Sequence, residues 1–270
     1  LAAHHQLGGR PRPAINGHLD HMKGAYLGPA FSTDASAEAL ERAGAVFDIL
    51  DDDEVITTTA EALALGKAVG WMQGRMEFGP RALGGRSILG DPRSPRMQKI
   101  LNLKVKYRES FRPFAPSVLF EDVSDWFEID EPSPYMLLVA DVVADRRRAM
   151  TAEEEALFGI DKLNVPRSEI PAVTHVDYSA RVQTVHESTN SRYWRLIQAF
   201  KQRTGCPILV NTSFNVRGEP IVCSPEHAHR CFLSTNMDAL VMERFVLLKS
   251  EQADAEQHAV DDYLAQFQLD

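Results

Sequence analysis

The sequence predicts an α/β or α+β fold with a twisted mixed β-sheet and flanking helices. Short apolar runs alternate along the chain with stretches whose apolar residues recur every three or four positions. These runs and stretches do not follow a strict βαβ rhythm, which favours a mixed sheet over a purely parallel one. The composition agrees, because 44% of the 270 residues are hydrophobic and 25% are charged, as in ordinary globular proteins.

The expected strands are short runs bounded by glycine, proline or polar residues. They are 68–72, 87–89, 114–120, 135–142, 182–185, 207–210, 239–242 and 245–248. Pro113 and Pro116 should limit the pairing of the third run, because proline has no amide hydrogen to give to a neighbouring strand.

The expected helices carry start or stop signals. They are 36–43, 59–65, 97–105, 152–158, 193–205 and one that begins at Ser224 and Pro225. Thr59 and Ser224 are typical N-cap residues, and Gly205 is a typical helix end. The acidic residues 48–54 are expected to form a solvated loop, residues 145–171 an insertion or flap, and the tail after 252 a polar helix.

The sequence argues against several classes of protein. No apolar run approaches the roughly 18 residues that cross a bilayer, and the first residues do not have the form of a signal peptide. The three cysteines are too few for a disulfide framework, so we expect reduced thiols in a cytoplasmic protein.

The charge is distributed unevenly. The chain has 29 Lys and Arg against 38 Asp and Glu, a net charge of −9. Residues 75–112 nevertheless contain ten basic and three acidic residues, a local charge of +7. A cationic island on an acidic protein indicates a pocket for a small anion rather than a face for a long nucleic acid.

The most unusual segment of this island is 78–86, which has three glycines, one proline, Arg81 and Arg86. Glycines let a backbone approach a ligand closely, and arginines present planar forks to phosphate or carboxylate. The pattern alone also allows a tight turn with surface arginines. If the chain is extended after Val105, then Lys106, Arg108 and Arg112 fall on one side of it.

Two further segments carry polar groups beside strands. Arg181 lies at the entry to a predicted strand, and Asn211 and Asn215 follow the carboxyl end of the strand 207–210, where ligands often bind in open α/β sheets. A capped turn is the alternative for the asparagines. The residues thus predict an anion pocket of arginines and a lysine, suited to phosphoryl or nucleotidyl chemistry by positioning and charge stabilisation.

Other constellations are weaker. Cys223, His227, His229 and Cys231 do not have the spacing of a structural zinc site, and we predict no metal site in this chain. The sequence contains no P-loop, no GxSxG elbow and no GxGxxG after a strand.

Four segments resemble the C-terminal, YrdC-like region of the O-carbamoyltransferases, which include nodulation-factor and antibiotic-tailoring enzymes. They are FGPRALGGRSIL at 78–89, VKYRESFRPFAP at 105–116, HVDYSARVQ at 175–183 and NTSFNVRGEPI at 211–221. The resemblance runs from about Tyr26 to Lys249. It implies that residues 31–250 form a YrdC-like domain, that 1–30 are the remnant of a preceding Kae1-like domain or a linker, and that 251–270 are a tail.

The resemblance also implies an activity and a set of site residues. The YrdC-like part takes carbamoyl phosphate and ATP, with Mg²⁺, and makes carbamoyl adenylate, whose carbamoyl group passes to an acceptor hydroxyl in the Kae1-like domain. Lys106 and Arg112 are expected to be catalytic and to hold phosphate or carbamate. The residues expected to bind carbamoyl and nucleotide groups are Arg81, Arg181, Asn211, Arg86, Arg108 and Asn215.

Two alternatives stay open at this point. One is a YrdC-type synthase that forms threonylcarbamoyl adenylate for tRNA, for which a net charge of −9 offers no basic RNA face. The other is a nucleotide-binding module without catalytic activity.

Overall fold

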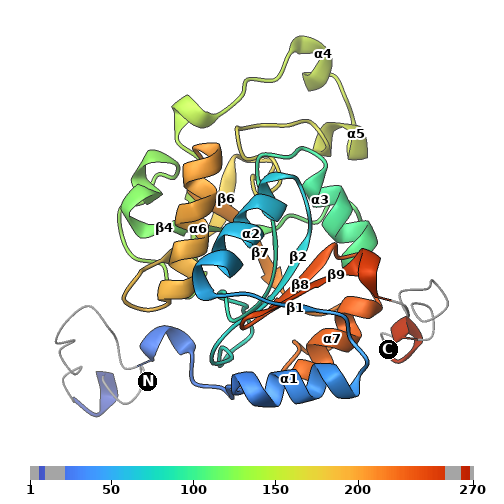
Figure 1. Ribbon diagram of the computed structural model, residues 1–270. Helices are drawn as coiled ribbons and strands as arrows, with labels where there is room; N and C mark the ends of the chain where they lie inside the picture. Colours follow the sequence, from blue (N-terminus) through green and yellow to red (C-terminus); the bar gives the residue numbers. More distant parts are fainter. Residues whose placement is uncertain (1–5, 10–21, 253–262, 268–270) are drawn as a thin grey trace.

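The computed structural model describes residues 6–9, 22–252 and 263–267, and within them nine strands form one sheet (Figure 1). The strands are β1 (Asp48–Ile49), β2 (Val69–Met72), β3 (Arg86–Gly90), β4 (Ala115–Leu119), β5 (Leu138–Asp141), β6 (Ser179–Val185), β7 (Ile208–Ser213), β8 (Ala239–Met242) and β9 (Phe245–Leu248). Their order across the sheet is β1-β9-β8-β2-β3-β7-β4-β6-β5. The pairs β2–β8 and β4–β6 are parallel and the other pairs are antiparallel, so the predicted mixed sheet with flanking helices is confirmed.

The helices are α1 (Thr33–Arg42), α2 (Asp52–Ala64), α3 (Met97–Ile100), α4 (Ala152–Glu155), α5 (Gly159–Leu163), α6 (Ser191–Thr204) and α7 (Pro225–Leu233). A π-helical segment, η3 (Leu101–Val105), continues α3, and short 3-10 turns cover Lys23–Ala25, Phe120–Asp125, Ala144–Arg146 and Lys249–Glu251. Helices α2 and α6 pack on each other and reach β2, β4 and β7, whereas α7 contacts β2 and β8 and carries α1 (Figure 1).

Local signals fix α6 and α7 where the sequence predicts them. Asn190 Oδ1 accepts a hydrogen bond from the Tyr193 amide at 3.1 Å, and the helix ends at Gly205, whose φ is +75°. The apolar stripe of α6 is fully buried, as expected from its spacing. Ser224 caps α7 and Pro225 occupies its first turn.

The acidic segment 48–54 is not the solvated loop that we predicted. It contains β1 and the start of α2, because Asp51 accepts hydrogen bonds from the Asp53 and Glu54 amides while Glu54 accepts one from the Asp51 amide. This reciprocal capping box starts the helix about two turns before the predicted cap, Thr59, which is buried inside α2.

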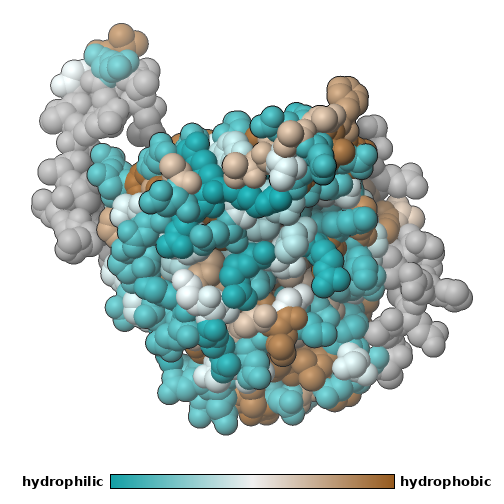
Figure 2. Space-filling view, turned by 90° about the horizontal axis from the view of Figure 1, so that it is seen from above, coloured by the Kyte–Doolittle hydropathy of each residue, from teal (hydrophilic) through white to brown (hydrophobic). Residues whose placement is uncertain are grey.

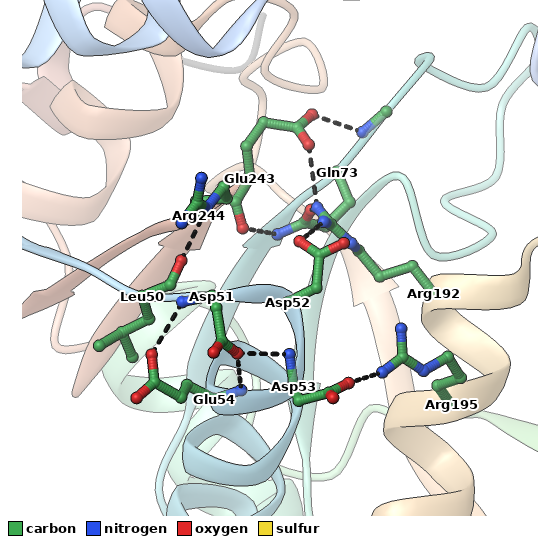
Figure 3. Close-up of polar contacts among 11 residues, drawn as sticks. Leu50, Asp51, Asp52, Asp53, Glu54, Gln73, Arg192, Arg195, Glu243 and Arg244 are labelled. Atoms are coloured by element: carbon green, nitrogen blue, oxygen red, sulfur yellow. Dashed lines mark hydrogen bonds and ion pairs between the residues drawn. The ribbon is translucent and has the colours of Figure 1, made fainter.

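Ion pairs hold this end of α2 against α6 (Figure 3). Arg192 of α6 pairs with Asp52, and Arg195 pairs with Asp53. Arg192 also reaches Glu243, which follows β8, at 3.1 Å. The acidic run of the sequence therefore faces basic residues of another helix, which is a long-range partnership that its local pattern does not reveal.

Strands β4 and β7 form the part of the sheet that carries the candidate site. Pro116 lies opposite Val210 on the β7 side of β4, but pairing with β6 begins only at Ser117, so proline limits the pairing on one side. β7 is longer than predicted: Asn211 is paired with Leu89 of β3 and with Ala115 of β4. Its side chain therefore belongs to the sheet rather than to a loop beyond it.

Three predicted segments differ in extent or lie outside the described residues. The insertion 145–171 begins in the 3-10 turn Ala144–Arg146 and contains the short helices α4 and α5, at the upper edge of Figure 1. Much of the predicted remnant 1–30 and of the tail 251–270 is outside the described residues, although 263–265 form a helical turn. Among the residues that the structure describes, no helix is long and apolar enough to cross a membrane.

Candidate anion-binding site

Residues from five separate segments line one cavity of about 560 Å³. Arg81 comes from the loop before β3, Arg108 and Arg112 from the segment before β4, and Arg181 from β6. The remaining lining residues are Pro80, Ala82, Pro113, Phe114, Ala115, Met136, Val139, His175, Asn211, Thr212 and Ser213. No described carboxylate is among them, so the cavity has a strongly cationic wall that suits an anion.

The glycine-rich loop that carries Arg81 is shaped from inside by one carboxylate. The buried Glu77 Oε1 accepts hydrogen bonds from the amides of Leu83 and Gly85, both at 2.6 Å. Gly84 has φ of +106°, and a Cβ there would lie 2.2 Å from the ring of Tyr193. These glycines therefore serve close packing within the protein, rather than the close approach to a ligand that we expected, and the loop leaves Arg81 exposed at the cavity.

Arg86 is not brought to the cavity. It is fully buried in β3, and its guanidinium donates to the carbonyl oxygens of Gly85 at 2.8 Å, Gly74 at 3.1 Å and Gln73 at 3.2 Å. Its Nη2 and Nε also reach carbonyl oxygens, at 3.4 Å. Arg86 thus has the partners of a structural residue that ties three backbone segments together.

Asn211 lies in the floor of the cavity with one free acceptor. Its Nδ2 donates to the Ala82 carbonyl at 3.1 Å and to Gln183 Oε1 at 2.8 Å, so the orientation of its amide is fixed by two acceptors. Its Oδ1 is buried and has no hydrogen-bond partner among the described residues. A buried acceptor without a partner is costly, and a ligand with an N–H or O–H group would satisfy it.

The arginines repel one another across the cavity. Burial lowers the pKa of Arg181, and the charge of Arg81 lowers it further. Burial and then the charge of Arg112 lower the pKa of Arg108 to about 10. Glu109 partly opposes this repulsion at Arg108, but no described carboxylate lines the cavity itself. Like charges held together cost free energy, which a bound anion would offset.

Asn102 fixes the segment that carries two of these arginines. Its Oδ1 accepts from Arg108 Nε at 2.6 Å, and its Nδ2 donates to the carbonyl oxygens of Ser110 and Arg112 at 3.0 and 2.8 Å. The Arg108 guanidinium also lies 4.9 Å from the centre of the Phe114 ring. The side chain of Arg108 and the backbone at Arg112 are therefore held before any ligand arrives, which lowers the entropic cost of binding.

Lys106 lies behind the cavity wall. The expected extended segment after Val105 is wrong, because Tyr107 has φ of +49° and turns the chain. Lys106 is buried, and its Nζ donates to the carbonyl oxygen of Ser213, which lines the cavity, and to Asn215 Oδ1 at 2.7 Å. Burial, more than any charge, lowers the pKa of Lys106 to about 7.

The predicted site residues thus fall into two sets. Arg81, Arg108, Arg112, Arg181 and Asn211 share the cavity, whereas Lys106, Asn215 and Arg86 are not among its lining residues. The cavity is also lined by His175, Thr212 and Ser213, which we did not predict as site residues. The only sequence signal for them is that they lie close in the chain to Arg181 or Asn211. Among the described residues, no group of three or more His, Cys, Asp or Glu side chains could hold a metal ion.

The fold and the cavity define an α/β domain with an arginine-lined cavity that suits an anion. Residues 60–249 match the family model "Carbamoyltransferase C-terminus", and the chain belongs to this family.

Curated relatives of this chain are longer proteins. It is 58% identical to the uncharacterized protein sll1178 of Synechocystis over 93% of this chain and 41% of the relative. It is 42% identical to nodulation protein NolO of Bradyrhizobium diazoefficiens over 89% of this chain and 40% of that protein. A 3'-hydroxymethylcephem-O-carbamoyltransferase of Amycolatopsis lactamdurans is 40% identical over 64% of this chain and 28% of the enzyme. The chain thus spans about two fifths of the length of the first two relatives.

A solved structure of full-length HypF, in a phosphate- and nucleotide-bound form, overlaps 75% of this chain and 22% of HypF. The TM-score is 0.44 and the sequence identity 18%, values that do not establish a shared fold.

Proposed function

We propose that this chain is the part of an O-carbamoyltransferase that binds carbamoyl phosphate and ATP and forms carbamoyl adenylate. The observation that carries the proposal is the cavity in which four arginines and the free acceptor of Asn211 converge, with no carboxylate among the lining residues that the structure describes. Transfer of the carbamoyl group to an acceptor hydroxyl belongs to a further, Kae1-like domain.

The proposed reaction consumes one water. Carbamoyl adenylate holds a single phosphate, which comes from ATP, so the phosphate of carbamoyl phosphate must leave as water cleaves it from carbamate. A carbamate oxygen then bonds to the α-phosphorus of ATP, and the bond from that phosphorus to the bridging oxygen breaks, with pyrophosphate leaving. Fixed guanidinium groups favour such a step because charge develops on the phosphoryl oxygens and on the leaving group.

Each polar group of the cavity has a role in this proposal. Arg81 and Arg181, whose charges act on each other, bind the nucleotide phosphates. Arg112 binds phosphate or carbamate, and the charge of Lys106 behind Ser213 adds to this attraction. Asn211 Oδ1 accepts a hydrogen bond from the amino group of the carbamoyl unit, which supplies the donor that this buried oxygen lacks.

Mg²⁺ enters the proposal with ATP. A magnesium ion prefers carboxylate, phosphate and water oxygens, and no described carboxylate lines the cavity. We therefore assign its ligands to the nucleotide phosphates and to water rather than to side chains of this cavity.

Pyrophosphate release from ATP, with and without carbamoyl phosphate, tests the proposal. We expect release only when both substrates and Mg²⁺ are present. Lys106→Ala should abolish it, while Lys99→Ala, which removes an exposed lysine of the same basic segment, should keep it. Circular dichroism of both variants would check that the fold is intact.

Two results would contradict the proposal. ATP binding without pyrophosphate release in the presence of carbamoyl phosphate would select a nucleotide-binding module without this activity. Release that depends on threonine and bicarbonate, instead of carbamoyl phosphate, would select a threonylcarbamoyl-adenylate synthase.

A further inference from the structure

A buried glutamine, Gln183, is hydrogen-bonded to the floor of the arginine-lined cavity without lining the cavity itself. Polar groups are abundant on the outer face drawn in Figure 2, which is largely hydrophilic. Gln183 lies instead in β6 and is only 2% exposed. A buried amide is costly unless its groups have partners, so the partners of Gln183 indicate what it does.

The sheet register brings Gln183 together with polar side chains of β4 and β7. Gln183 is paired with Ser117 of β4. Asn211 of β7 is paired with Ala115, two residues before Ser117, so Ser117 and Asn211 lie on the same face of the sheet. Ser117 Oγ donates to Gln183 Oε1 at 2.5 Å, and Asn211 Nδ2 donates to the same oxygen at 2.8 Å. These three side chains are buried, where a missing hydrogen bond costs most.

Two carbonyl groups of the glycine-rich loop decide which way both amides point. The Leu83 carbonyl accepts from Gln183 Nε2 at 2.8 Å and from the Tyr26 hydroxyl at 2.7 Å. A carbonyl oxygen can only accept, so Gln183 must direct its NH₂ group to Leu83 and its Oε1 to Asn211. Asn211 must then direct its NH₂ group to this oxygen, and the Ala82 carbonyl requires the same orientation.

This orientation determines what Asn211 offers to a ligand. Both hydrogens of its NH₂ group are committed to protein oxygens, and its Oδ1 has no partner among the described residues. An asparagine that could turn over would meet a ligand with either a donor or an acceptor. Asn211 is held so that it can only accept, which favours a ligand group that carries an N–H.

We propose that Gln183 is a positioning residue that holds the amide of Asn211 and thereby makes the cavity prefer a carbamoyl group to an acyl group of the same shape. The inference rests on the proposed function and adds to it the determinant of acyl specificity. A carbamoyl group has an NH₂ that donates to Asn211 Oδ1. An acetyl group has a methyl in its place, which leaves this buried oxygen without a donor.

Calorimetric titration of carbamoyl phosphate and of acetyl phosphate into the full chain tests this role, because the two ligands differ only by amino and methyl. We expect carbamoyl phosphate to bind at least about tenfold more tightly, a difference of about 1.4 kcal/mol. In Gln183→Met, whose side chain is of similar length but has no amide, the preference should fall below about threefold. Gln183→Asn keeps a polar group but is too short to reach both partners, so it should lose the preference too and decides the matter if Gln183→Met does not fold.

A conservative variant and a matched control separate positioning from general loss of stability. In Gln183→Glu, a carboxyl oxygen still accepts from Asn211 Nδ2, so this variant should retain the preference. The control is Gln252→Met, which removes an equally well-bonded amide far from the cavity. Gln252 is 8% exposed, donates to the carbonyl oxygens of Val46 and Leu248, and accepts from the Val46 amide. It should lose stability and keep the preference.

The possible failures are distinct. Equal affinities for the two ligands in the unchanged chain, or a preference that survives in both Gln183→Met and Gln183→Asn, would overturn the role of Gln183. A preference that Gln252→Met or Gln183→Glu also loses would overturn it as well, because ratios would then follow stability or any change at the position. If carbamoyl phosphate does not bind to the unchanged chain at all, the proposed function itself fails.

Discussion

Lys106 Nζ donates to Asn215 Oδ1 over 2.7 Å, and the same ammonium group reaches the carbonyl oxygen of Ser213 in the cavity wall. The lysine is therefore held behind the wall by the strand and turn that carry the floor of the cavity. The positive charge of its ammonium group attracts an anion in the cavity from behind the backbone of Ser213. This arrangement makes the charge state of Lys106 a determinant of anion binding.

We predict that anion binding weakens as the pH rises through about 7. The pKa of Lys106 is about 7, and an anion favours the protonated form, so affinity is highest below this pKa and falls above it. Sulfate is the suitable probe, because its own charge is constant in this range. His175 interferes little, since burial holds its pKa below the usual value. Calorimetry across the range in the unchanged chain and in Lys106→Met checks the prediction, and an equally steep dependence in the variant would argue against it.

Arg81→Met should weaken anion binding and stabilise the empty protein slightly. The charge of Arg81 lowers the pKa of Arg181, which means that the two guanidinium groups repel each other without an anion. We expect a loss of about tenfold or more in sulfate affinity and a rise of about 0.5 kcal/mol in the free energy of unfolding. Urea titration in sulfate-free and sulfate-containing buffer measures both effects. A variant that is less stable in both buffers would contradict this interpretation.

Arg86→Met should destabilise the fold by about 3–5 kcal/mol, because it leaves several buried carbonyl oxygens without a donor. Arg96→Met, at an exposed position of the same basic segment, is the control and should change stability by less than about 0.5 kcal/mol. Thermal unfolding distinguishes the two. A stable Arg86→Met protein that has lost only its affinity for anions would restore the ligand-binding role that the sequence indicated.

The described C-terminal turn should help to hold the residues around Lys106. The Tyr263 hydroxyl donates to Glu219 Oε1, whose partner oxygen accepts from the Val216 amide at 2.8 Å, and the Glu219 carbonyl accepts from Asn215 Nδ2. Tyr263→Phe should therefore cost about 1 kcal/mol of unfolding free energy and weaken sulfate binding. Tyr178→Phe removes a longer and more exposed hydrogen bond and serves as the control. Equal effects of the two variants would show that the turn does not support the site.

Much of the fold could be predicted because its signals are local. Ser224 and Pro225 mark the start of α7, Gly205 marks the end of α6, and the strands β8 and β9 have the predicted bounds. The start of α2 differs from the predicted one because Asp51 and Glu54 cap each other within an acidic run whose charge favours a solvated surface. The spacing of these two residues also indicates a capping box.

The site was predictable only in part. Motif resemblance identified Arg81, Arg112 and Arg181, which share the cavity. It could not separate them from Arg86, because burial depends on which carbonyl oxygens surround a guanidinium in the folded chain. It also could not place Lys106 behind the wall, since Tyr107 turns the chain there and its hydroxyl donates to the carbonyl of Ser234, far away in the sequence.

Calorimetric titration of carbamoyl phosphate and of ATP, each into the unchanged chain and into Arg112→Met and Arg181→Met, tests the central claim most directly. That claim is that arginines from separate segments bind one group of anionic substrates in one cavity. The account predicts saturable binding of each substrate, with sulfate as a competitor, and a loss of at least about tenfold in each variant. Binding that neither variant weakens, or that sulfate does not displace, would contradict it.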